Sequence, residues 1–444
     1  MKPVAAKPVP QEKRKEPKKP VAAVADGSTT DGNKYLKYLI NFWIFIPAVV
    51  YFNMVSVYAL NIPMQDDYDA ILKFLTDWVM TPSFTDRFFM LFTQHGDHRI
   101  LHSRLLYVWY YDLFGKVNLR NIIFISNIQL LVAYVVLVHF IKKAIPKYWN
   151  VVSLVAGFCI FDPSSYENAT FAMCGLVNYG VIMFFMISLY FFTRPGNRNL
   201  VIALVSQFFC IFASGGGVMS ALCLPVFLLL SKDKRRAIYS GALLVIGTAL
   251  YYTHYTKGSD PAELHDPFSL MRIVRFLLHM MGSHFSFENG ILAGVCVLLV
   301  LVLTFPLDIK KLQIKENTLP LICVLAAVGA TTLSIAVFRS DYTAGEVASY
   351  WSRYLIYSHM LAALAFVFLW ILFMGKKVLW PVMGVATLCL LYAYKDNYAY
   401  GEGCMAMIQR RMQNRPYYYP DAAKAKEIES HACRLGIYCI QDER

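Results

Sequence analysis

The chain has 444 residues, of which 57% are hydrophobic, 15% aromatic and only 16% charged. A soluble protein carries about a quarter charged residues, and here the deficit is concentrated in long apolar runs, which excludes an ordinary soluble protein. The net charge of +13 does not indicate nucleic-acid binding, because the Lys and Arg residues lie in short loops between apolar runs, as in membrane proteins.

Residues 1–35 are rich in Lys, Pro and Ala and hold almost no large apolar side chains. Such a segment cannot bury enough surface to fold, so we predict a disordered, basic cytoplasmic tail. The first apolar run follows at about 36–60 and is too long for the hydrophobic region of a cleavable signal peptide. We therefore predict that it is the first membrane span.

About eleven apolar runs are long enough to cross a hydrocarbon core. Basic residues mark every second connection between them, which places those connections in the cytoplasm. The marking residues are Lys142, Lys143, Lys147, Arg194, Arg198, Lys232, Lys234, Arg235, Arg236, Lys310, Lys311, Lys315, Lys376 and Lys377. The sequence thus predicts an all-α, polytopic transmembrane bundle over 36–394, with a cytoplasmic N-terminus and an exported helical tail, 395–444.

The remaining connections are predicted to face outward together. They are 62–119, 162–173, 214–217, 254–288 and 339–353. Within the long first loop, 100–116 is predicted to be a helix rather than a span, because a span there would place Lys142 outside. In the exported tail, oxidising conditions permit Cys433 to form a disulfide with Cys404 or Cys439.

Three carboxylates crowd the start of the first outer loop in Asp66-Asp67-Tyr68-Asp69. Like charges near a low-dielectric surface raise at least one pKa, which is how a general base is tuned. The alternative is an ordinary helix start, where Asp is favoured.

The densest ionisable cluster is 94–104. His95, His98, Arg99 and His102 follow a spacing that would place them on one face of a helix, with Asp97 and Arg104 on another. His98 and His102 have the spacing of a helical metal pair, but no Glu-rich partner follows, and no metal site is predicted. An interfacial, salt-bridged helix is the alternative.

Two further outer segments carry polar or flexible residues. The loop 162–170 contains Asp162, Glu167 and Asn168, and could be a solvated hairpin. The run Ser214-Gly215-Gly216-Gly217 lacks the Lys-Ser/Thr sequel of a phosphate loop. Tight helix packing explains the glycines better.

Two arginines stand at the outer boundary, where positive charge is disfavoured. Arg339 ends one apolar run, and Arg353 begins the next within Tyr350-Trp351-Ser352-Arg353-Tyr354. Guanidinium groups suit phosphate oxygens, although anchoring in the aromatic belt of the membrane is the alternative. Arg272 and Arg275 are weaker candidates.

The order of these motifs resembles the GT-C superfamily of membrane glycosyltransferases, which carry a carboxylate just past the first span, here Asp66 and Asp67. Asp97-His98-Arg99, Tyr166-Glu167-Asn168 and Ser352-Arg353-Tyr354 resemble motifs of bacterial multi-span proteins assigned to that superfamily. The architecture is also similar to that of serotype-converting glucosyltransferases acting on O-antigen. The resemblance covers roughly 36–440 and rests on motif order and topology.

The resemblance implies an inverting glycosyltransferase in the bacterial inner membrane. It would move a sugar from a polyprenyl-phosphate donor, such as an undecaprenyl lipid, to a hydroxyl of a periplasmic cell-envelope glycan or glycolipid. Asp66 or Asp67 would be the base. The donor phosphate would be bound by Arg353, Arg339 and Arg99, and the substrates by His95, Asp97, His98, Glu167, Asn168 and Tyr354. No cofactor is expected, and the need for a divalent cation stays open.

Two other functions are compatible with the sequence. A transporter also carries charged groups within its bundle, although here the charges cluster at one surface and the halves show no internal repeat. A polysaccharide polymerase or ligase would share the substrates on a different fold.

Overall fold

The computed structural model describes residues 41–256, 269–304, 307–308, 313–314, 316–340, 352–414 and 417–440. The predicted tail 1–35 lies outside these residues, as do Asp341, Tyr350 and Trp351 of the late outer segment. The chain divides into two compact units, Met1–Phe42 and Trp43–Arg444. The helices and strands that carry the candidate site belong to the second unit.

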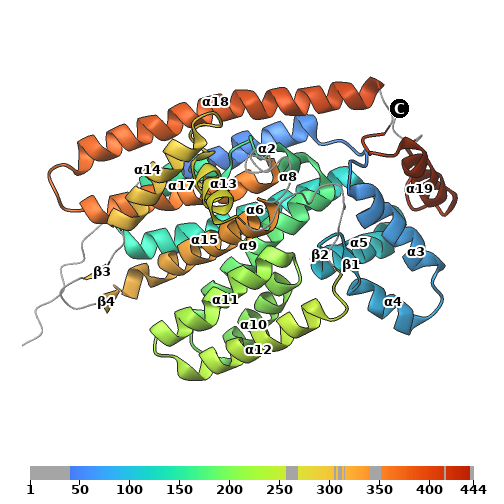
Figure 1. The fold of residues 1–444 in the computed structure, drawn as a ribbon, viewed down its shortest axis with the longest axis horizontal. Coiled ribbons are helices and arrows are strands. Elements are labelled where there is room, and N and C mark those ends of the chain that lie inside the picture. The colour runs from blue at the N-terminus through green and yellow to red at the C-terminus, as the bar shows by residue number, and fades with distance from the viewer. Residues whose placement is uncertain are drawn as a thin grey trace, which may run out of the picture. The chain divides into compact units, whose positions relative to one another are not determined.

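The described part of the chain is almost entirely helical, as predicted (Figure 1). The first part of the described chain contains one apolar helix, α2, and several short helices and strands. These are η1 (Trp43–Phe45), α2 (Ile46–Tyr58), the π-helical η2 (Tyr68–Lys73), α3 (Phe74–Met80), α4 (Phe84–Leu91), β1 (Gln94–His95), β2 (His98–Arg99) and α5 (Leu101–Phe114). The predicted helix within 100–116 is thus confirmed as α5.

Mostly longer helices follow, together with one further short hairpin that is formed by β3 and β4. They are α6 (Leu119–Ala144), α7 (Trp149–Ile160), α8 (Tyr166–Thr170), α9 (Ala172–Phe192), α10 (Asn197–Ile211), α11 (Gly215–Leu230), α12 (Lys234–Tyr252), α13 (Leu270–Gly282), α14 (Gly290–Thr304), β3 (Leu307–Asp308), β4 (Gln313–Ile314), η3 (Glu316–Thr318), α15 (Leu319–Arg339), α17 (Ser352–Phe373), α18 (Leu379–Asn414) and α19 (Ala422–Arg434).

Among the described residues, four helical segments are long and apolar enough to cross a membrane by length and composition: 119–144, 172–192, 316–339 and 352–373. Shorter apolar helices occupy 43–58, 149–160, 197–211, 215–230 and 290–304. These helices fit a membrane protein. The count of about eleven spans stays a prediction.

The helices are arranged around α9 and α17, whose residues are mostly buried. α9 packs against α6 and α10, whereas α17 packs against α7 and α14. Large apolar side chains on the helices at the periphery of the bundle are exposed, such as Leu303 of α14 (72%) and Leu388 of α18 (69%). A surface of this kind is stable in contact with lipid chains, which need no hydrogen bonds from it.

Several helices begin at a side-chain cap, which satisfies backbone N–H groups left free in the first turn. Asn118 accepts from the backbone of Asn121 at the start of α6. Asp421 does the same for Ala423 and Lys424 at the start of α19.

The C-terminal segment packs against the short elements that follow α2. α18 runs without a break through residue 394, the predicted end of the last span, and α19 then contacts η2 and α3 (Figure 1). Cys433 forms a disulfide with Cys439, one of the two predicted pairings, and Cys404 is free.

Gly217 supports the prediction that the glycine run serves tight packing. A Cβ atom at this position would lie 1.8 Å from the carbonyl oxygen of Cys210, so α11 can approach the end of α10 only because this side chain is missing. Gly241 of α12, in contrast, has nothing within 4 Å of such an atom.

We predict that Gly217→Ala destabilises the protein by about 1–3 kcal/mol or more, because the backbone of Cys210 must move to make room. Gly241→Ala is the matched control and should be neutral or slightly stabilising, since Ala favours a helix over Gly. Thermal unfolding of the purified proteins in detergent measures the difference. Equal melting temperatures for the two variants would contradict this account of the glycine run.

Candidate functional site

The two neighbouring carboxylates Asp66 and Asp67 lie in different surroundings. Asp67 is 1% exposed. Its Oδ1 accepts the backbone N–H of Met173 at 2.9 Å, and its Oδ2 accepts that of Met64 at 3.1 Å. Met173 lies in the first turn of α9, where a carboxylate is favoured by unpaired N–H groups. Asp67 therefore holds the segment after α2 on the start of α9, with both of its oxygens occupied.

Burial raises the pKa of Asp67 from 3.8 to about 7, although the N–H groups of Met173 and Met64 lower it in part. The Asp66 charge beside it adds to the rise. One carboxyl group of the acidic run thus has a raised pKa, as the crowding of charges predicts. The main cause, however, is desolvation.

The Tyr166-Glu167-Asn168 and Ser352-Arg353 motifs bind each other directly. The Arg353 guanidinium donates from Nε to Oε2 of Glu167 at 3.2 Å and from Nη2 to Oε1 at 3.3 Å. The backbone N–H of Arg353 also donates to Glu167, at 3.1 Å. Asn168 donates to the carbonyl oxygen of Arg353 at 2.8 Å, and Ser352 accepts the backbone N–H of Glu167 at 2.9 Å. The first turn of α17 is therefore fixed onto α8.

Arg353 also reaches the acidic run. Its Nη1 lies 3.7 Å from Oδ2 of Asp66, and its Nη2 donates to Oε1 of Gln65 at 3.0 Å. Asp66 is about half exposed, in contrast to Asp67. Gln65 has a left-handed backbone (φ 47°), and its N–H donates to the carbonyl oxygen of Tyr418 at 2.7 Å. The structure thus brings Asp66, Glu167 and Arg353 together.

An open pocket of about 650 Å³ lies beside Asp66. Its walls come from the segment after α2 and from the C-terminal segment. They are formed by Gln65, Asp66, Asp69, Arg411, Tyr418, Tyr419, Pro420, Asp421 and Lys424. Lys424 Nζ lies 3.1 Å from Oδ1 of Asp69, and Arg411 lies over the Tyr418 ring at 4.7 Å. The pocket therefore combines a carboxylate, cations and aromatic rings.

The prediction that His95, His98, Arg99 and His102 share a helical face is wrong. Residues 94–99 form the antiparallel hairpin β1–β2, in which His95 pairs with His98, and the helix begins only at Leu101. Gly96 adopts φ +50° at the turn, a conformation that side chains rarely take. The Gly96-Asp97 turn thus overrides the helical spacing.

The hairpin carries the remaining polar candidates. Asp97 Oδ2 lies 3.4 Å from Nη2 of Arg339. Burial lowers the pKa of His98 to about 4, and the Arg339 charge lowers it further. Burial also lowers the pKa of His95, whereas the Asp66 charge raises it in part. Burial thus favours the neutral form of both histidines.

Arg99 is bound within the protein. Its Nε donates to the carbonyl oxygen of Tyr251 at 2.5 Å, and its Nη atoms donate to the carbonyl oxygens of Phe92 and Thr253. Tyr251 and Thr253 lie at the end of α12, where unpaired carbonyls attract a cation. Tyr354 packs with Ile273 and neighbouring apolar side chains.

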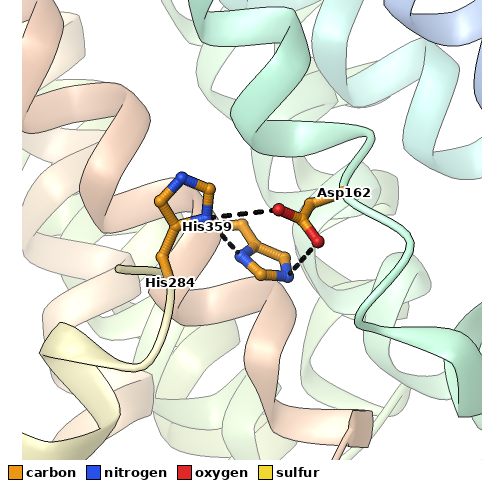
Figure 2. Close-up of side chains that lie close together, drawn as sticks. All are labelled: Asp162, His284 and His359. Carbon is orange, nitrogen blue, oxygen red and sulfur yellow. Dashed lines mark hydrogen bonds and ion pairs between the residues drawn. The ribbon is translucent and has the colours of Figure 1, made fainter. Parts of the chain in front are cut away.

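The sequence did not reveal one polar cluster, formed by Asp162, His284 and His359. Asp162 follows α7, His284 lies between α13 and α14, and His359 lies within α17. The side chains of all three have 0% exposure and point toward one another (Figure 2). His359 lies within an apolar run and His284 in a connection far from both partners in sequence, so no local spacing could have connected them to Asp162.

The fold and the site define a class: an all-α protein with candidate membrane helices and a pocket beside a carboxylate–arginine cluster. No protein-family model matches the chain, and no curated protein matches it significantly.

We predict that Asp67→Asn flattens the pH dependence of stability. The pKa of Asp67 is raised in the folded chain, so its ionisation opposes folding. The contribution of Asp67 to the free energy of unfolding is therefore fully present below about pH 4 and declines as the pH rises to about 7. An Asn at this position cannot titrate. Melting temperatures measured across this interval should decline less in the variant than in the wild type.

Asp77→Asn is the control, because Asp77 is an exposed partner of Lys73 on the same loop. It should retain the wild-type slope. A slope in Asp67→Asn equal to that of the wild type would show that Asp67 does not titrate in this interval.

Proposed function

We propose that this protein is an inverting glycosyltransferase that uses a polyprenyl-phosphate sugar on the outer side of a membrane. The observation that carries the proposal is the contact of Arg353 with both Asp66 and Glu167 at the edge of an open pocket. The order of the motifs resembles that of GT-C enzymes, and two of those motifs meet in this cluster.

In this proposal Asp66 is the general base. It is half exposed, it lines the pocket, and its contact with Arg353 leaves it free to approach an acceptor. Asp66 takes the proton of the acceptor hydroxyl while that oxygen attacks the anomeric carbon. The bond from this carbon to the lipid phosphate breaks, and the phosphate leaves with the electron pair. Displacement from the opposite face inverts the configuration.

Asp67 receives a different role. Asp67 is buried, and its oxygens accept two backbone N–H groups, one of them from the start of α9. Asp67 therefore fixes the backbone next to Asp66 and so positions Asp66. Arg353 and Glu167 orient Asp66 from the other side. Arg99 is not used, since its donors go to backbone carbonyls. Asp97 and Arg339 form an ion pair between the hairpin and the end of α15 and are not among the residues that line the pocket.

The pocket supplies groups suited to the donor. Arg411 and Lys424 line it and would stabilise the negative charge of the leaving phosphate, an effect that is typically worth about 10²–10³ in rate per charge partner. The Tyr418 and Tyr419 rings would contact the sugar or the lipid. The sequence prediction placed the phosphate on Arg353, Arg339 and Arg99. We assign it instead to Arg411 and Lys424, because these two cations line the pocket.

We predict that Asp66→Asn lowers the rate of sugar transfer about 10²–10⁴-fold without lowering the yield of folded protein, because it removes the base and keeps the shape. Asp77→Asn, an exposed carboxylate outside the pocket, should transfer sugar at the wild-type rate. Transfer is measured with purified protein, a polyprenyl-phosphate sugar and an envelope glycan acceptor. Full activity of Asp66→Asn would remove Asp66 from the mechanism.

The proposal also requires a defined topology. Reporter fusions after Lys143 should be active only as cytoplasmic reporters, because three Lys residues mark the end of this span. Fusions at the C-terminus should be active only as periplasmic reporters. The reversed pattern would place the Asp66–Arg353 cluster on the cytoplasmic side and would overturn the use of an outer-leaflet donor.

A further inference from the structure

The buried cluster of Asp162, His284 and His359 has the donor set of a metal site. Among the described residues it is the one group of three or more His, Cys, Asp or Glu side chains close enough to hold an ion. One ligand atom from each residue lies within 4.8 Å of the others. The three come from separate parts of the sequence and point toward a common point (Figure 2).

The distances are close to those around a tetrahedral ion. His284 Nδ1 lies 3.5 Å from Oδ2 of Asp162 and 2.9 Å from Nδ1 of His359. Ligand atoms at about 2.0–2.1 Å from zinc are separated by roughly 3.3 Å in a tetrahedron. His359 faces His284 through Nδ1 and Asp162 through Nε2, which lies 3.6 Å from Oδ1, so coordination of one ion also requires the His359 ring to turn.

Within this cluster, one nitrogen of His284 has two contacts to satisfy. Two imidazole nitrogens and a carboxylate oxygen converge, and His284 Nδ1 faces both of the other groups with at most one proton to donate. Asp162 is buried, and within the described residues its ion-pair contacts are only with the two histidines. A divalent cation would satisfy the three atoms at once and would compensate the buried negative charge.

Surrounding polar groups hold the ligands in place. Ser164 donates to Oδ1 of Asp162 from its backbone N–H at 2.9 Å and from its hydroxyl at 2.7 Å. Asn397 of α18 donates to Oδ2 at 2.8 Å and to the carbonyl oxygen of His284 at 2.9 Å. Ser358 accepts the backbone N–H of His284 at 2.9 Å. Partners of this kind orient the ligands of known metal sites.

We propose that Asp162, His284 and His359 bind a divalent first-row transition-metal ion, for which zinc fits the two-nitrogen, one-oxygen donor set best. The ion links the end of α7, the α13–α14 loop and α17, with α18 attached through Asn397. Three protein ligands leave a fourth position for water or the nearby Ser164 hydroxyl. This site is separate from the proposed transfer chemistry at Asp66.

The test uses the full chain purified in detergent through a tag without histidines. Elemental analysis by mass spectrometry should find about one transition-metal ion per chain. After treatment with a chelator, Co²⁺ should restore this stoichiometry and give the visible d–d absorption of a low-symmetry site, and the melting temperature should rise with the added metal.

Asp162→Asn and His359→Gln should bind at least about tenfold less metal, because each removes a ligand. His102→Gln is the matched control: His102 is also buried, but it lies in α5 and packs on the Phe184 ring rather than in the cluster. It should bind metal as the wild type does. The Co²⁺ titration of wild-type protein tests metal binding even where a variant does not fold. A monodisperse wild type with neither bound metal nor a cobalt spectrum would overturn the proposal and leave a hydrogen-bonded triad.

Discussion

The guanidinium group of Arg353 joins the start of α17 to α8 and to the Gln65–Asp66 segment. It is only one-quarter exposed, at the start of a helix that is buried along most of its length. A charge in such a place is costly unless it is paired and hydrogen-bonded. Arg353 meets this requirement through Glu167, Gln65 and Asp66, which belong to two other segments. Removing the charge would therefore release α8 and the Gln65–Asp66 segment together.

The helix that carries Arg353 also carries the second polar cluster. Ser352 and Arg353 bind α8 at one end of α17, and two turns later Ser358 and His359 contact His284 and Asp162. Polar groups inside an apolar bundle must be satisfied by one another, because no water or lipid group can replace a missing partner. α17 is thus the common element of the pocket edge and of the proposed metal site, although the two differ in chemistry.

The sequence predicted the helical class and the motifs that meet at Arg353. It did so because apolar runs, basic connections and ionisable residues at a membrane boundary are local signals. The same signals could not separate Asp66 from Asp67. These neighbours differ only in tertiary surroundings, one in the pocket and the other under the start of α9.

Other features depend on contacts that sequence spacing does not record. The spacing of the histidines in 95–102 fits a helix, yet a positive φ at Gly96 forms a hairpin. Arg411 and Lys424 belong to the C-terminal segment, and only its packing on the segment after α2 places them in the pocket. His284 and His359 meet Asp162 through the packing of α7, α14 and α17, which no local pattern predicts.

The most direct test of the transfer mechanism is the anomeric configuration of the product. Purified full-length protein would be incubated with polyprenyl-phosphate sugars of defined configuration and an envelope glycan acceptor, and the new linkage would be assigned by NMR. A single displacement assisted by Asp66 predicts a product with the configuration opposite to that of the donor. Retention of configuration, or no transfer from any donor in the panel, would contradict it.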